Sequence, residues 1–309
     1  MPILVGTSLG GVGAIGPAPD LTDVTWTTAT GRITRLSDWP SGYLVQPGAR
    51  GLDMPAYVAY EDESPGIDGN YRRGTRATAR EVMLPIAIYS DDGRIAFLAR
   101  KRQLLRDMNP QLGRGTITLA EADGSARSII AFYASGAEGD ETEDAAGRTW
   151  TNYNLTFTCE SPYWLGDPLR KTFRVAGGGS FFPSGVPWNV SDSQVLGDHV
   201  MMTNPGDVVA FPVWTINGPM TTATFTNNDT GETFTLTHTL VAGDTVVIDC
   251  RERVKTVLLN GTTNLWPDLD ETATLFGLQP DVNDVSLDVS GTTSATQITL
   301  DLVPRYLSA

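Results

Sequence analysis

The alternation of apolar and polar side chains is clearest between residues 149 and 168. Apolar or large side chains recur at every second position, at Thr151, Tyr153, Leu155, Phe157 and Cys159. A strand with one buried face has this period of two. Ser161-Pro162-Tyr163-Trp164 follows at once, and Pro168 comes shortly after. Because proline cannot donate to a continuing ladder, the pattern predicts a strand that closes a domain at an aromatic corner.

Similar short runs of valine, threonine and isoleucine, separated by glycine and proline, recur along most of the chain. Before the corner they predict strands at residues 24–26, 31–36, 79–89, 115–120 and 127–133. Pro85 lies inside one of them, which predicts an edge or bulged strand. Residues 61–74 read as a long polar loop that changes from acidic to basic. That loop is either solvated or makes a subunit contact, with its acidic end against Arg72, Arg73 or Arg76 of a neighbouring copy.

One segment has helical spacing, from Asp91 to Met108. Its apolar positions are Ile95, Leu98, Leu105 and Met108, with Asp91 or Asp92 as a cap and Asn109-Pro110 as the end. It also carries the only basic cluster of the chain: Arg100, Lys101, Arg102 and Arg106. Cations near a helix C-terminus complement the helix dipole, so this cluster is expected to be a solvated face rather than a nucleic-acid site.

The last hundred or so residues contain no helical period. Strands are expected at 208–216, 221–226, 233–239, 245–249, 254–259, 285–289 and 297–303, with a hairpin turn at Asn227–Gly231. Residues 169–200 are rich in glycine, proline and aromatic side chains and read as a linker. The fold class is therefore mainly β, with a one-helix domain at 1–168, a linker at 169–200 and a β-sandwich at 201–309.

The net charge of the chain excludes some classes of function. The 309-residue chain has a net charge of −14, which argues against binding nucleic acid through its backbone and would suit a surface that DNA must pass. No apolar run approaches the ~20 residues of a membrane span. The N-terminus lacks a signal-peptide pattern, so we expect folding in the cytoplasm of the producing cell.

Candidate chemistry is sparse. Cys159 and Cys250 lie in apolar runs and are expected to be buried and unpaired, while His199 and His238 are too scattered for a triad or most metal sites. Gly11, Gly13 and Gly16 have the spacing of a dinucleotide loop, but Pro17 follows and no helix does. This segment is expected to be an arm that orders against a neighbour.

Two acidic runs could in principle hold a metal ion. Glu138–Asp144 carries enough carboxylates for calcium but lacks EF-hand spacing, and Asp268–Glu271 is a shorter run of the same kind. Exposed loops are the better interpretation of both. The sequence therefore predicts no catalytic residue, no cofactor-binding residue and no metal ligand.

Several motifs, in this order along the chain, resemble one family. They are the Ser161–Trp164 corner, Asn204-Pro205-Gly206-Asp207 with Pro212, Gly243-Asp244 with Asp249, Asn260-Gly261, and Leu278–Asn283. The sequence thereby resembles the distal tail (Dit) proteins of long-tailed bacteriophages with flexible tails. In that family the last motif usually has glycine where this chain has Asp281, which puts the local turn geometry in doubt.

The resemblance implies a structural virion protein and not an enzyme. Dit proteins form a hexameric ring at the end of the tail tube, with the N-terminal domain building the ring and a galectin-like domain pointing outward. The implied partners are other copies of the chain, the tail tube protein and the tail-associated hub protein, with the tape measure and receptor-binding proteins as further candidates. DNA passes through the ring.

Two other functions remain open at this stage. A carbohydrate-binding module is the first, with Trp188, Trp214, Trp266 and His238 as the available side chains, although the alternation around Trp214 favours a core position. A glycosidase using two carboxylates is the second, and its pair cannot be placed among so many acidic residues.

Overall fold

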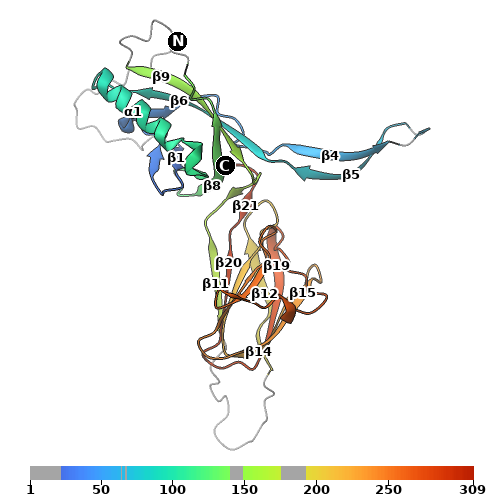
Figure 1. The fold of residues 1–309 in the computed structure, drawn as a ribbon. Helices are drawn as coiled ribbons and strands as arrows, with labels where there is room; N and C mark the ends of the chain where they lie inside the picture. Colours follow the sequence, from blue (N-terminus) through green and yellow to red (C-terminus); the bar gives the residue numbers. More distant parts are fainter. Residues whose placement is uncertain (1–21, 64, 67, 140–148, 175–192) are drawn as a thin grey trace, which may run out of the picture.

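The computed structural model describes residues 22–63, 65–66, 68–139, 149–174 and 193–309. Two β-rich bodies are stacked end to end, and a two-stranded arm projects sideways from the first (Figure 1). We call them the N-terminal body, the C-terminal body and the arm. The predicted mainly β class is confirmed, and the described residues contain one α-helix.

The N-terminal body is built on one sheet with the strand order β2-β1-β7-β8-β9-β6-β3. Its strands are β1 Asp23–Thr27, β2 Ile33–Arg35, β3 Tyr43–Val45, β6 Arg80–Tyr89, β7 Gly115–Ala120, β8 Ala126–Ser135 and β9 Trp150–Cys159. Strands β6 and β9 pair over ten residues, and β6 is buried at every second position. The alternation seen in the sequence therefore places one face of this sheet against the core.

The helix is shorter than expected, and only part of the predicted apolar face is buried: Leu98 and Met108 pack on the core, whereas Ile95 and Leu105 are exposed. Helix α1 spans Arg94–Asp107 and begins after Gly93, with no side-chain cap. Ile95 is 87% exposed, whereas Phe97 and Leu104 are buried against the sheet. The sequence offers two overlapping apolar faces on this helix, and contact with the sheet selects the one that contains Phe97.

Pro85 does not mark an edge strand. Strand β6 lies between β9 and β3, and Gln46 N donates to Pro85 O over 2.7 Å. In an antiparallel ladder the N and the C=O of a residue face the same neighbour, so the missing N–H of Pro85 faces the β3 side. Because β3 has already ended at Val45, the proline interrupts no long ladder.

The C-terminal body is a sandwich of a six-stranded and a four-stranded sheet, with the strand orders β11-β20-β13-β16-β17-β18 and β12-β19-β14-β15. The strands are β11 Leu169–Arg174, β12 Ser193–Asn204, β13 Val213–Asn217, β14 Met220–Asn227, β15 Thr233–Leu240, β16 Thr245–Asp249, β17 Thr256–Leu259, β18 Thr263–Asn264, β19 Asp281–Ser290 and β20 Gln297–Leu302. Trp214, Phe225, Phe234 and Phe276 form a chain of aromatic contacts between the sheets.

Three predicted boundaries differ from the structure. The strand expected at 208–216 begins only at Val213, with isolated bridges at Val208 and Ala210. The expected linker carries sandwich strands at both ends, because β11 pairs with β20 along its length and β12 pairs with β19. Residues 175–192 lie outside the described residues. The composition suggested a linker because glycine and proline are concentrated in the middle of this segment. The strands at its two ends could not be recognised from an average over the whole segment.

The end of the described chain returns to the N-terminal body. Strand β21, Arg305–Tyr306, pairs with β10, Trp164–Leu165. Ala309 N then donates to Leu52 O over 2.8 Å. Residues 305–309 therefore contact the first body, although the sequence assigned them to the second. None of the helices in the described ranges is long and apolar enough to cross a membrane.

Candidate assembly interface

The segment predicted as a polar loop is a β-hairpin arm. Strand β4, Tyr57–Glu63, pairs with β5, Asn70–Ala77, over seven residue pairs with one bulge. Tyrosine, valine and threonine among its polar residues favour strands. The loop prediction was wrong here because charged residues dominate the composition even though the backbone pairs. The arm extends far from both bodies (Figure 1).

The arm has no hydrophobic core of its own. Every residue of β4 is exposed, and Tyr60 and Tyr71 are 49% and 69% exposed. An isolated two-stranded hairpin is at best marginally stable in water. Large exposed aromatic side chains on such a ribbon are typical of a surface that another protein covers.

The two strands of the arm carry opposite charges. Strand β4 ends in Glu61-Asp62-Glu63, and β5 contains Arg72, Arg73 and Arg76. Asp62 and Arg73 form an ion pair at 2.6 Å, and Asn70 Nδ2 donates to Glu61 over 2.9 Å. Glu63 and Arg76 form no ion pair with any other described residue, so both charges remain available to a partner.

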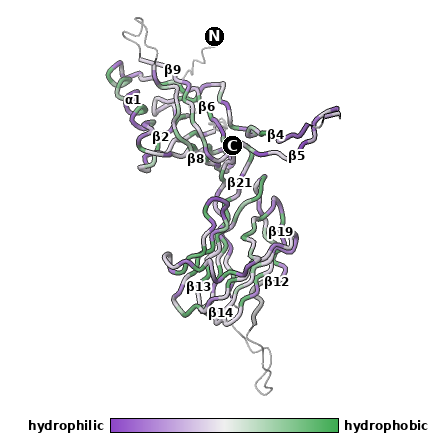
Figure 2. The backbone as a smooth tube through the Cα atoms, turned by 45° about the vertical axis from the view of Figure 1, so that its right-hand side comes forward, coloured by the Kyte–Doolittle hydropathy of each residue, from purple (hydrophilic) through white to green (hydrophobic). Residues whose placement is uncertain are grey.

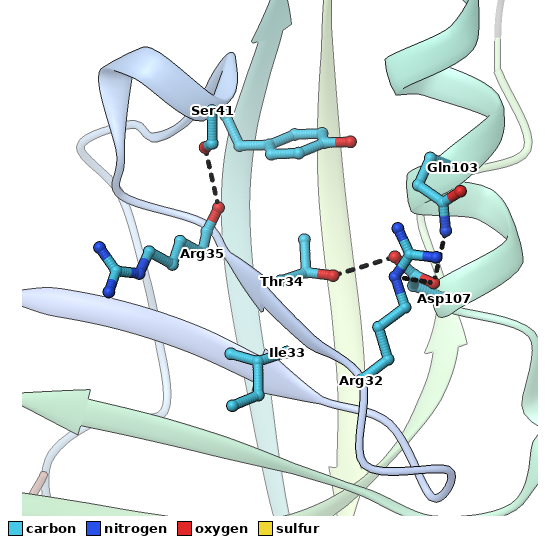
Figure 3. Close-up of a pocket in the computed structure, with 8 residues that line it drawn as sticks. Arg32, Ile33, Thr34, Arg35, Ser41, Gln103 and Asp107 are labelled. Carbon is cyan, nitrogen blue, oxygen red and sulfur yellow. Dashed lines mark hydrogen bonds and ion pairs between the residues drawn. The ribbon is translucent and has the colours of Figure 1, made fainter.

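A shallow cleft of about 410 Å³ lies between β2 and α1 (Figure 3). Asp107 is buried at its back and accepts hydrogen bonds of 2.9 Å from Thr34 Oγ1 and Gln103 Nε2. Arg32 Nε lies 3.3 Å from Asp107 Oδ1. The carboxylate is thus fully partnered within the chain and holds β2 to the helix, a structural role that its place in a charged helix did not reveal.

A joint of backbone and side-chain contacts connects the two bodies. Arg80 is 3% exposed and donates to the carbonyl oxygens of Pro162, Gly51, Asp53 and Leu307. Burial lowers the pKa of this guanidinium from its usual value. The corner predicted from Ser161–Trp164 therefore lies at the joint.

Arg305 holds the other side of this joint. Its guanidinium lies over the rings of Tyr163 and Phe211, at 5.0 and 5.1 Å from their centroids, and donates to Val209 O. Asp207 accepts from Leu307 N over 2.9 Å. The Asn204–Asp207 motif thus contacts the returning chain, a role that no local pattern in the sequence indicates.

The cysteine prediction is confirmed. Cys159 and Cys250 are buried and free, in different bodies. Burial raises the pKa of their thiols to about 11 and about 12. At neutral pH both remain protonated and act as small apolar side chains.

The basic cluster of the helix is only partly solvated. Arg100 donates to Tyr89 O over 2.8 Å and pairs with Asp92, while Lys101 lies over the ring of Tyr153. Burial first, and then Arg94, lower the pKa of Lys101. Two of the four cations therefore face the sheet, because long side chains can cover apolar surface while their charged ends reach the rim.

The remaining candidate residues do not converge on one site. His199 and His238 pair separately with Asp284 and Asp268, at 2.6 and 2.8 Å. Among the described residues, no three His, Cys, Asp or Glu side chains form a group that could hold a metal ion. Gly11–Gly16, Asp140–Asp144 and Trp188 lie outside the described residues.

Trp214 has no exposed surface, as expected, and Trp266 is 45% exposed on a short 3-10 turn, Trp266–Asp268. Asp281, where the resemblance suggested glycine, adopts a left-handed backbone with φ 69°. This region of the backbone is one that glycine adopts freely and that aspartate tolerates better than most other residues.

Comparison with known proteins supports a tail-component fold. Residues 205–306 match the family described as "Siphovirus-type tail component, C-terminal domain". The crystal structure of Dit from phage SPP1, described as a paradigm of the hub adsorption apparatus in phages infecting Gram-positive bacteria, is similar over 91% of this chain and 98% of that one. Its TM-score is 0.62 at 14% identity.

A chain of the baseplate of phage P2, in its activated conformation with calcium, is similar over 92% of this chain and 98% of its own, with a TM-score of 0.50 at 10% identity. No curated protein matches the sequence. At sequence identities of 14% and 10%, the structural similarity establishes a shared fold and nothing further. The resemblance to distal tail proteins is thus confirmed in the fold and, through the matching family, in residues 205–306.

Proposed function

We propose that this protein forms a hexameric ring at the tip of a bacteriophage tail, joining the tail tube to the hub below it. The match of residues 205–306 to a siphovirus-type tail component carries the proposal. The fold shared with SPP1 Dit across both bodies supports extending it to the whole chain.

In this proposal the N-terminal body builds the ring. The C-terminal body is a galectin-like outer module that points away from the ring axis. The partners are further copies of the chain, the tail tube protein and the hub protein. The net charge of −14 suits a lumen that lets DNA pass, because like charges repel phosphate. We propose no catalytic activity and no cofactor, and we place the protein in the virion.

The arm is proposed to hold one subunit to the next. It projects sideways from the body and exposes Tyr57, Tyr60 and Tyr71. Burying such aromatic side chains against a neighbour would contribute much of the contact energy of an interface.

The decisive measurement is the mass of the purified protein by light scattering, with negative-stain images of the same sample. We expect a mass near six chains and annular particles. The double variant Tyr60→Ser/Tyr71→Ser should fold normally and lose the ring, because these side chains contribute nothing to either core. The matched control, Val241→Ser, changes an exposed apolar residue of the C-terminal body and should assemble like the wild type. A wild-type protein that stays monomeric at high concentration would contradict the ring.

A carbohydrate-binding module remains the second candidate, and one observation favours it. Trp266 is half exposed and sits on the same turn as Asp268, which orients His238 through a 2.8 Å contact. A glycan array with the wild type and Trp266→Ala tests this. Specific glycan binding that is lost in the variant would support the carbohydrate-binding module. If the wild type binds no glycan, the structural role is the only candidate function that remains.

A further inference from the structure

Strand β2 is an open edge of the N-terminal sheet. Thr28 N donates to Arg32 O over 2.9 Å, and Leu36 N donates to Val24 O over 2.7 Å. Because successive residues of an antiparallel strand face opposite neighbours, the N–H and C=O groups of Ile33 and Arg35 point away from β1. Among the described residues, one 3.3 Å hydrogen bond from Ser41 Oγ to Arg35 O reaches these groups. Such an edge can accept another strand.

This edge also carries a free cation and apolar surface. Arg35 is exposed and lies within ion-pair distance of no other described carboxylate, whereas Arg32 is already held by Asp107. Figure 3 shows Arg35 directed away from the Asp107 cluster. Ile33 and Trp39 beside it are 65% and 58% exposed. A partner for this edge should therefore offer a strand, an anion and apolar side chains.

Strand β4 of the arm has the complementary features. It pairs with β5 alone, so its outer edge faces no described strand. Glu63 is exposed and forms no ion pair among the described residues, and Val58 and Tyr60 are exposed on the same strand. Strand β5, in contrast, carries Arg72, Arg73 and Arg76, which would repel Arg35. Charge therefore favours β4 over β5 as the partner of β2.

The arm and β2 lie on opposite flanks of the N-terminal body. The arm extends to the right in Figures 1 and 2, whereas β1 and α1 in the first view, and β2 in the second, lie to the left. A closed ring of identical copies uses two different surfaces of each protomer, one meeting the other on the next copy. Opposite placement of an exposed arm and an open edge suits this arrangement.

We propose that β4 of one copy docks along β2 of the next, with Glu63 of the arm pairing with Arg35 of the receiving copy. Main-chain hydrogen bonds would extend the sheet across the subunit boundary, and Ile33 and Trp39 would be covered by the apolar side chains of the arm. This inference rests on the proposed ring and names the surface that receives the arm.

Charge exchange tests the pairing. Arg35→Glu and Glu63→Arg, each alone, should raise the concentration at which half the protein is assembled by roughly tenfold, since each places like charges together. The double variant restores opposite charges and should recover most of the assembly seen by light scattering. The matched control, Arg253→Glu, reverses an exposed arginine of the C-terminal body and should assemble like the wild type.

A pair of introduced cysteines tests the same contact in an otherwise unchanged chain. Arg35→Cys with Glu63→Cys should give, on mild oxidation, a ladder of linked chains on a non-reducing gel. Cys159 and Cys250 are buried, so each single variant should give no ladder beyond a dimer. Normal assembly of Arg35→Glu together with no ladder would overturn the inference. The role of the arm would still stand if Tyr60→Ser/Tyr71→Ser loses assembly, and would fall with the inference if that variant also assembles. The ring itself would fall only if the wild type stays monomeric.

Discussion

Single buried residues hold the joint together, and Arg80 is the clearest of them. Its guanidinium donates to four backbone carbonyl oxygens from three separate segments of the chain and lies over the ring of Trp164, 5.9 Å from the ring centroid. Carbonyl groups of loops have few other donors once they are buried. One side chain thus replaces the regular ladder that these segments lack.

Replacing Arg80 should therefore be costly. Arg80→Met keeps much of the side-chain volume but leaves the carbonyl oxygens without a donor, so we expect a loss of about 3 kcal/mol in the free energy of unfolding. Urea denaturation followed by tryptophan fluorescence measures this. Arg114→Ala, an exposed arginine of the same body, should change stability by less than about 0.5 kcal/mol. Equal stability of both variants would show that water replaces the guanidinium.

Asp281 offers the opposite case, a residue that could be improved. Its φ of 69° costs an aspartate more than a glycine, so Asp281→Gly should stabilise the C-terminal body by about 0.5 kcal/mol. Asp288→Gly, in the extended part of the same strand β19, should instead destabilise it by about 0.5–1 kcal/mol. Thermal unfolding compares the two, and a loss of stability in both would refute the strain argument.

Whether the burial of a residue could be predicted depended on whether its neighbours in the structure are also its neighbours in the sequence. The burial of Trp214 and the two cysteines follows from alternation within one strand. Arg80 and Asp107, by contrast, are buried among partners from distant segments, and no local pattern separates them from solvated charges.

At the scale of elements, strand pairing was predicted best where one face is buried. The ladders of β7 with β8 and of β14 with β15 join segments that were predicted as strands, and the second ladder also flanks the predicted turn at Asn227–Gly231. The arm was missed because both of its faces are exposed, so its residues lack the apolar–polar alternation by which strands are recognised. Its aromatic residues at positions 57, 60 and 71 were the available signal.

The end of strand β16 gives the C-terminal body a dependence on acid. Burial raises the pKa of Asp249, but hydrogen bonds from the side chain and backbone of Arg251 outweigh it, and the net pKa lies below the usual 3.8. A carboxylate with a lowered folded-state pKa contributes stability above its unfolded pKa and loses it as the pH falls through the folded value. The Asp249–Arg251 pair should therefore stabilise this body at neutral pH and fail below about pH 4.

We expect Asp249→Asn to lower the stability of this body at pH 7 and to flatten its decline below about pH 4. Denaturation curves between pH 3 and pH 7 measure both effects. Glu271→Gln removes an exposed charge from the same body and should leave the curve parallel to that of the wild type. An unchanged acid dependence in Asp249→Asn would assign the effect to other groups.

At the scale of the whole molecule, the connection between the two bodies was not predictable from the sequence. Strand β11 and the return of residues 305–309 cross the expected domain boundaries. Such crossings depend on contacts more than a hundred residues apart in sequence, as in the bond from Arg80 to Leu307. The proposed ring could not be derived from these contacts either, because the rotational symmetry of an assembly leaves no trace in the sequence of one chain.

Close packing at the joint fixes how the C-terminal body is held, and Gly206 tests this. A Cβ on Gly206 would lie 2.6 Å from Arg305 O and 2.8 Å from Arg305 N, whereas a Cβ on Gly74 in the arm would meet nothing within 4 Å. Gly206→Ala must therefore push the returning strand away from the Asn204–Asp207 motif. Because β21 connects both bodies, we expect their relative orientation to loosen while each sandwich or sheet stays folded. Small-angle scattering at concentrations below assembly should show a broader distribution of interatomic distances for Gly206→Ala and an unchanged one for Gly74→Ala. Identical scattering from the two variants would mean that other contacts, among them those of Arg80, hold the orientation without this packing.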